Sequence, residues 1–169
     1  GGIVPGSAIL IGGHPGAGKS TLLLQVMCGL AKNMTALYVT GEESLQQVAM
    51  RANRLNLPTD KLNMLSETSV EQICNLADQL KPQIIVVDSI QVMHLSDIQS
   101  SPGSVAQVRE CASFLTRYAK TRQVAIIMVG HVTKDGTLAG PKVLEHAIDC
   151  SLLLEGEADS RFRTLRSHK

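Results

Sequence analysis

The chain has 169 residues, which is enough for one domain with a sizeable core, and its formal net charge is +1. A charge so close to zero neither requires nor excludes a polyanionic partner. Aromatic residues make up 2% of the chain, which argues against base stacking as a main mode of nucleic-acid recognition.

The four cysteines are far apart and none belongs to a C-x-x-C motif, so we expect neither a zinc site nor a disulfide framework. Reduced thiols indicate a cytoplasmic protein. No apolar run reaches the roughly 18 residues of a membrane span, so we expect no membrane partner. Both ends look like cuts, so we expect a single domain over residues 1–169 of a longer protein.

Strand and helix patterns alternate along the chain. Strands are predicted at Ser7–Gly12, Thr35–Thr40, Asn63–Ser66, Gln83–Ser89, Val124–Gly130, Ile148–Leu154 and Arg161–His168. Helices are predicted at Thr21–Lys32, Leu45–Arg54, Val70–Leu80 and Ser104–Thr121. This alternation predicts an α/β fold, with a mostly parallel central sheet and helices on both faces. A turn at Gly156–Ser160 predicts a C-terminal β-hairpin.

The apolar positions of two helices predict their buried faces. For the first helix these are Leu22, Leu23, Val26, Met27 and Leu30, and for the last they are Val105, Val108, Ala112, Leu115 and Ala119. Two long polar loops, at 90–103 and at 132–141, follow the strands that end near residues 89 and 130.

A P-loop pattern, G-x-x-x-x-G-K-[ST], lies between the first strand and the first helix, the context that argues against a chance match. Its glycines allow backbone N–H groups to surround a phosphate, and the helix N-terminus adds partial positive charge. Lys19 can reach the β- and γ-phosphates, and Ser20 can bind Mg²⁺. The predicted nucleotide-binding residues are Gly13, His14, Pro15, Gly16, Ala17, Gly18, Lys19, Ser20 and Thr21.

Asp88 ends a buried apolar strand, which fits the Walker B role of holding Mg²⁺ through its water shell. The alternative is an aspartate that caps the following turn. The next residue is Ser89, so no carboxylate directly follows the proposed metal anchor.

Glu42 and Glu43 follow the second strand and offer the missing carboxylate, because ends of parallel strands meet at one edge of the sheet. We favour Glu42 as the general base, with Glu43 as the second candidate. The alternative is that both are solvated acids at a helix N-terminus.

His131 ends the strand after Asp88 on the same edge. It either contacts the γ-phosphate or bonds to nearby backbone, and the sequence leaves both interpretations open. No N-K-x-D guanine motif is present, which favours ATP over GTP.

Several longer motifs resemble the RecA-like ATPases, and within them the ATPase core of the bacterial RadA (Sms) DNA-repair family. They are the P-loop, Tyr38–Ser44, Asp88–Gln91, Ser101–Glu110, Gly130–Gly136, Ala139–His146 and Arg161–Arg163. The resemblance covers essentially the whole chain.

This resemblance implies an ATP-driven ring, hexameric in the full-length protein, that moves on single-stranded DNA and recombination intermediates alongside other recombination proteins. ATP would lie between subunits, and the loops 90–103 and 132–141 would face a central channel. Arg109, Lys134 and Lys142 are then candidates for DNA phosphate contacts, although each is equally readable as a solvated surface charge.

The family carries a Lys-Asn-Arg-Phe-Gly motif after the last strand, and this chain stops at Lys169, which matches its first residue. Lys169 is therefore the candidate to act on a neighbouring subunit's nucleotide. The family's zinc-binding N-terminal segment and Lon-protease-like C-terminal domain are not in this sequence.

Two other functions stay open. A regulatory, ring-forming ATPase similar to the circadian clock proteins would share the Gly41–Ser44 motif and act on protein partners. A small-molecule kinase would need an arginine-rich lid, and the arginines between Asp88 and His131 follow helical spacing instead.

Overall fold

The computed structural model describes residues 3–14, 16–131, 144, 146–155 and 164–167, and the structural statements below concern these residues. They form a central sheet of seven strands in the order β3-β2-β4-β5-β1-β6-β7. The strands are β1 (Ala8–Gly13), β2 (Ala36–Thr40), β3 (Asn63–Ser66), β4 (Ile84–Asp88), β5 (Ala125–His131), β6 (Cys150–Glu155) and β7 (Thr164–Ser167). The helices are α1 (Lys19–Leu30), α2 (Leu45–Arg54), α3 (Val70–Leu80), α4 (Val105–Arg122) and the 3₁₀ helix η1 (Ile90–Val92).

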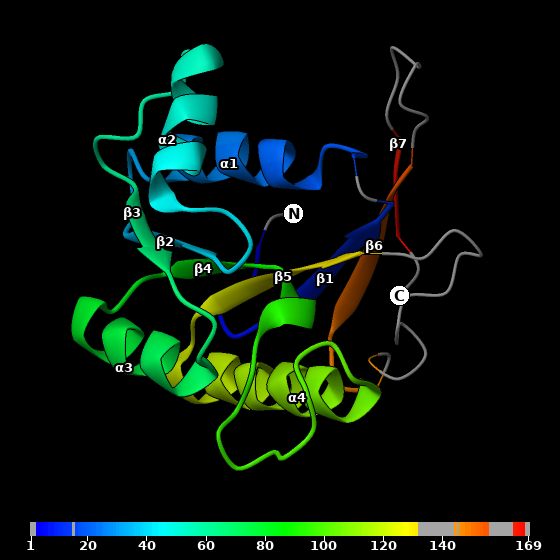
Figure 1. The fold of residues 1–169 in the computed structure, drawn as a ribbon. Helices are drawn as coiled ribbons and strands as arrows, with labels where there is room; N and C mark the ends of the chain where they lie inside the picture. The colour runs from blue at the N-terminus through cyan, green and yellow to red at the C-terminus, as the bar shows by residue number, and fades with distance from the viewer. Residues whose placement is uncertain (1–2, 15, 132–143, 145, 156–163, 168–169) are drawn as a thin grey trace.

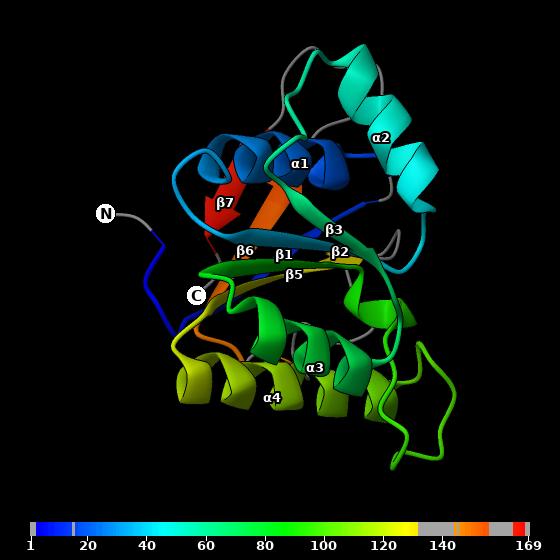
Figure 2. The ribbon, with the colours of Figure 1, turned by 90° about the vertical axis from the view of Figure 1, so that its left-hand side faces the viewer.

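The strands β1 to β6 pair in parallel, and β7 pairs antiparallel with β6. Helices α1 and α2 cover one face of the sheet and α3 and α4 cover the other (Figures 1 and 2). The predicted α/β fold of RecA-like type is therefore confirmed. The predicted turn of the C-terminal hairpin, residues 156–160, and the polar loop 132–141 lie outside the described residues.

Two apolar cores form because successive side chains of a strand point to opposite faces of the sheet. Val39, Val87 and Ile126 belong to the core under α3 and α4. Tyr38 and Val86 belong to the core under α1 and α2. The central strands are covered on both faces, which explains their continuous apolar sequences.

The predicted inner face of α1 is partly wrong. Leu24 and Cys28 are buried beside Leu23 and Met27, whereas Leu22 and Val26 are half-buried. Three consecutive leucines fit either of two neighbouring stripes, so their periodicity could not decide which one packs on the sheet.

Val105, also predicted to be buried, is 49% exposed in the first turn of α4, while the buried stripe runs through Val108, Cys111 and Leu115.

Serine side chains cap three of the described helices. Ser44, Ser69 and Ser104 each accept a hydrogen bond from the backbone N–H three residues later, at the starts of α2, α3 and α4. At α2 the Gln47 side chain accepts a hydrogen bond from the Ser44 backbone N–H in return, which completes a capping box.

The carboxyl ends of the central strands meet at one edge of the sheet. In the parallel register Gly13 is opposite His131, and Thr40 is opposite Asp88. The P-loop, the acidic residues and the histidine therefore all lie at the same edge of the sheet. None of the helices in the described ranges is both long and apolar enough to span a membrane.

Candidate active site

The P-loop places an uncapped helix start at the edge of the sheet. Gly18 precedes α1 with a φ of 95°, and no side chain caps the helix, unlike α2, α3 and α4. Gly16 also has a positive φ, of 86°, and a Cβ added there would meet open space. These two glycines allow the left-handed backbone conformations through which the loop turns into α1. The N-terminal N–H groups of α1 are thus left available to an anion.

Lys19 is the first residue of α1, and its side chain is nearly inaccessible, with 3% of the residue exposed. Its ammonium group donates to the carbonyl oxygens of Gly13 at 2.5 Å and His14 at 3.0 Å. Burial lowers the pKa of Lys19, while the negative charges of Asp88 and Glu42 oppose that shift. The cation therefore contacts the P-loop backbone and interacts with the charges of Asp88, at the end of β4, and Glu42, after β2.

Asp88 is buried at the end of β4, and its two oxygens have different surroundings. Oδ2 accepts hydrogen bonds from Ser20 Oγ at 2.5 Å and from the Tyr38 hydroxyl at 2.9 Å. Oδ1 is buried and has no hydrogen-bond partner among the described residues. Burial raises the pKa of Asp88, and the hydrogen bonds from Ser20 and Tyr38 oppose this.

The donor set at Asp88 fits a hydrated Mg²⁺. Mg²⁺ prefers oxygen ligands and usually keeps several waters, so it needs few protein groups. Ser20 and Asp88 lie within hydrogen-bond distance of each other, and the free Oδ1 is an acceptor that a metal-bound water would satisfy.

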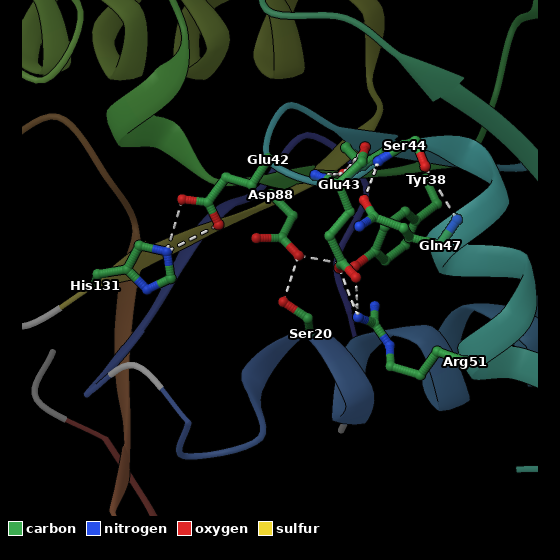
Figure 3. A network of polar contacts seen from close by, with 10 residues as sticks. Ser20, Tyr38, Glu42, Glu43, Ser44, Gln47, Arg51, Asp88 and His131 are labelled. Carbon is green, nitrogen blue, oxygen red and sulfur yellow. Dashed lines mark hydrogen bonds and ion pairs between the residues drawn. The ribbon is translucent and has the colours of Figure 1, made fainter. Parts of the chain in front are cut away.

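The two adjacent glutamates point to different partners, Glu42 toward His131 and Glu43 toward Arg51 (Figure 3). Glu43 turns toward α2, where Arg51 Nη1 donates to both of its oxygens at 2.6 and 2.7 Å. Its backbone also exchanges two hydrogen bonds with the Thr40 side chain. Glu42 instead turns toward Ser89 and His131 at the edge of the sheet. The geometry therefore separates the two candidates for the base: Glu43 is paired with Arg51, whereas the charge of Glu42 acts on Lys19 of the P-loop.

Glu42 is held by a serine and a histidine. The Ser89 hydroxyl donates to Oε1 at 3.0 Å, and His131 Nε2 lies 3.0 Å from both carboxylate oxygens. The hydrogen bond with His131 is the largest cause of a lowered pKa at Glu42; burial opposes it, and the charge of Lys19 adds to it. A carboxylate in this position is ionised near neutral pH and can accept a proton or a hydrogen bond from water.

Of the two interpretations left open for His131, a bond from its side chain to nearby backbone is not what the structure shows. Nε2 contacts the Glu42 carboxylate, and the buried Nδ1 has no partner in the part of the chain that the structure describes. It is the His131 carbonyl that takes part in a main-chain contact, accepting from Gln91 Nε2 at 3.2 Å. The other interpretation, a γ-phosphate contact, stays a prediction.

Comparison with known proteins shows the family to which the chain belongs. Residues 1–137 match the family model described as an AAA domain. The chain belongs to this AAA domain family.

Curated relatives match the AAA domain and the residues that follow it. The proteins named DNA repair protein RadA from Haemophilus influenzae, Escherichia coli and Bacillus subtilis are 96%, 78% and 51% identical to it. Each match covers 100% of this chain and 37% of the relative. The expected resemblance to RadA is confirmed, and the chain spans about 37% of the length of these relatives.

The candidate DNA contacts of the AAA domain are only partly described. Arg109 is exposed on α4 and lies 3.8 Å from the Glu110 carboxylate, an arrangement of little energetic weight. Lys134, Lys142 and Lys169 lie outside the described residues, as does Pro15 of the P-loop.

Three polar residues around the site were missed by the sequence interpretation: Tyr38, Ser89 and Arg51. Tyr38 had a signal, since it lies two residues before Thr40, on the face of β2 that carries Asp88 on the neighbouring strand. Arg51 and Ser89 had no such signal in the sequence, because the chain's path after β2 and β4 is what brings them to Glu43 and Glu42.

Proposed function

We propose that the chain is the ATP-binding and ATP-hydrolysing core of a DNA-dependent ATPase that acts in DNA repair. The observation that carries the proposal is the convergence of Lys19, Asp88 and Glu42 beside the uncapped start of α1. A triphosphate needs backbone N–H groups and a cation, and its hydrolysis needs a metal anchor and a carboxylate that orients water.

Each residue has a separate role in this proposal. The backbone of residues 13–21 and the N–H groups at the start of α1 bind the phosphates, and Lys19 neutralises their charge. Ser20 and Asp88 would hold Mg²⁺, which would offset the negative charge that develops on the phosphates. Glu42 orients the attacking water and accepts its proton. Glu43, tied to Arg51, fixes the backbone that carries Glu42.

DNA is proposed as the binding partner because the relatives are named DNA repair protein RadA. Single-stranded DNA and recombination intermediates would bind Arg109, Lys134 and Lys142 through phosphates, without sequence preference. The proposal also includes a homo-oligomeric ring, in which Lys169 lies near a neighbouring subunit's nucleotide. It further includes helicase-type translocation, branch migration and contacts with other recombination proteins. It also places the protein in the cytoplasm, where free thiols such as the four found here persist.

The relatives' name favours this function over a circadian-type regulatory ATPase, since it is a DNA repair name. ATP hydrolysis by the full-length protein, measured with and without single-stranded DNA, tests the proposal. We expect DNA to stimulate hydrolysis and Lys19→Ala to abolish it. ATP-driven ring assembly without DNA affinity at low salt would support the regulatory function instead.

A substitution pair separates DNA contacts from general charge effects. Lys134→Gln is expected to weaken DNA binding and to lower the slope of log affinity against log salt by about one. Lys81→Gln is the control, because exposed Lys81 follows α3 at the opposite edge of the sheet from Asp88. Equal DNA affinity in both variants and the unsubstituted protein would contradict the proposed role of Lys134.

A further inference from the structure

The buried Tyr38 hydroxyl contacts Asp88, the proposed metal anchor, from within the apolar core. Tyr38 is fully buried in β2, in the core under α1 and α2, and its hydroxyl donates to Asp88 Oδ2 at 2.9 Å. Its register partner on β4 is Val86, two residues before Asp88 on the same face. The tyrosine side chain therefore reaches along that face toward the end of β4, where its hydroxyl meets Asp88.

Two donors converge on one oxygen of Asp88. Ser20 Oγ and the Tyr38 hydroxyl both donate to Oδ2, whereas Oδ1 has no partner among the described residues. Figure 3 shows Oδ2 facing Ser20 and Tyr38, with the other oxygen directed away from them. Because Ser20 is itself a proposed metal ligand, Tyr38 is the donor of the two that is free of any other role.

We propose that Tyr38 is a positioning residue for magnesium: its hydroxyl fixes the plane of the Asp88 carboxylate so that Oδ1 is presented to a metal-bound water. This inference rests on the proposed function of the site. Groups that hydrogen-bond to metal-binding carboxylates orient them, and their substitution typically lowers metal affinity by about 10–100-fold. We expect the lower end of this range, about tenfold, because Ser20 still holds Oδ2.

The chain offers a matched control. Tyr118, the second of its two tyrosines, also donates its hydroxyl to an aspartate, Asp78, at 2.7 Å. That pair joins α4 to α3 and involves none of the residues around the P-loop. Tyr38→Phe and Tyr118→Phe each remove one hydroxyl from a carboxylate and keep the ring, so only the first is expected to change metal binding.

The test measures Mn²⁺, a paramagnetic substitute for Mg²⁺, by electron paramagnetic resonance in the presence of saturating ADP. We expect the Mn²⁺ dissociation constant to rise about tenfold in Tyr38→Phe and to stay unchanged in Tyr118→Phe. ADP affinity in EDTA should be equal in all three proteins, which also shows that the variant site is folded. Higher Mg²⁺ should restore the ATPase activity of Tyr38→Phe.

The outcomes separate the inference from the function on which it rests. Equal Mn²⁺ affinity in Tyr38→Phe and the unsubstituted protein would overturn the positioning role alone. A parallel loss of ADP affinity in EDTA would also overturn it, since the effect would then be a general loosening of the core. Failure of the unsubstituted protein to bind Mn²⁺ with ADP would overturn the proposed nucleotide site itself.

Discussion

His131 and Glu42 meet at the edge of the sheet, with His131 Nε2 3.0 Å from each carboxylate oxygen. His131 is the last residue of β5, and Glu42 follows β2, with β4 between these strands. The contact therefore joins the proposed base to the last residue of β5, across the strand β4 that ends in Asp88.

This pair predicts a specific pH dependence of stability. Since the pKa of Glu42 is lowered in the folded protein, chiefly by the His131 hydrogen bond, the unfolded chain binds the proton more readily. The stabilising contribution of Glu42 is therefore complete above its ordinary pKa of 4.5 and is lost as the pH falls through the lower folded-state value. In His131→Ala this contribution should shrink.

Urea unfolding of the two proteins between about pH 3 and pH 6 measures the effect. The difference between their free energies of unfolding should narrow as the solution becomes more acidic. A difference that is constant over this range would show that the ionised state of Glu42 does not depend on His131.

A side chain at Gly41 is predicted to destabilise the fold because it would clash with its neighbours. A Cβ at this position would lie 2.6 Å from Val92 Cγ2 and 2.9 Å from Met93 Cε, in the packed region after β2. Gly41→Ala should therefore destabilise the fold by about 1–3 kcal/mol and shift the glutamates that follow it. Gly29→Ala in α1 is the control, because nothing lies within 4 Å of an added Cβ there.

Thermal unfolding distinguishes the two glycine variants. Gly29→Ala should be neutral or stabilising by up to about 1 kcal/mol, as alanine favours helix. Equal stability of the two variants would mean that Val92 and Met93 can move aside at little cost.

Lys19→Met should separate nucleotide affinity from folding. Methionine keeps an unbranched apolar stem and removes a buried charge whose pKa is lowered chiefly by burial. We expect the thermal midpoint without nucleotide to hold or rise, and ATP affinity to fall by at least about 100-fold, in keeping with the loss of a charge-assisted phosphate contact. Isothermal calorimetry measures the affinity, and retained ATP binding would exclude Lys19 from the phosphate site.

Local patterns predicted those parts of the molecule that depend on neighbouring residues. The bounds of α2, α3 and β3 are the ones that the sequence pattern predicted. Asp88 was found because a buried strand ends in an acid.

The contacts around Asp88 and Glu42 could not be found in this way. Tyr38 and Asp88 are 50 residues apart and Glu42 and His131 are 89 apart, and only the strand order β2-β4-β5 brings them together. Likewise, the neighbouring residues Glu42 and Glu43 look equivalent in sequence, and it is Arg51 on α2 that turns one of them away.

The comparison of Glu42→Gln with Glu43→Gln tests the central claim most directly, because the two substitutions are chemically identical and adjacent. Steady-state ATP hydrolysis by the full-length protein with single-stranded DNA is the measurement, with ATP affinity as the check on binding. We predict that Glu42→Gln lowers kcat by about 100-fold or more while ATP still binds, and that Glu43→Gln mainly lowers the thermal midpoint. Full activity in Glu42→Gln, or an equal loss of kcat in both variants, would contradict the account.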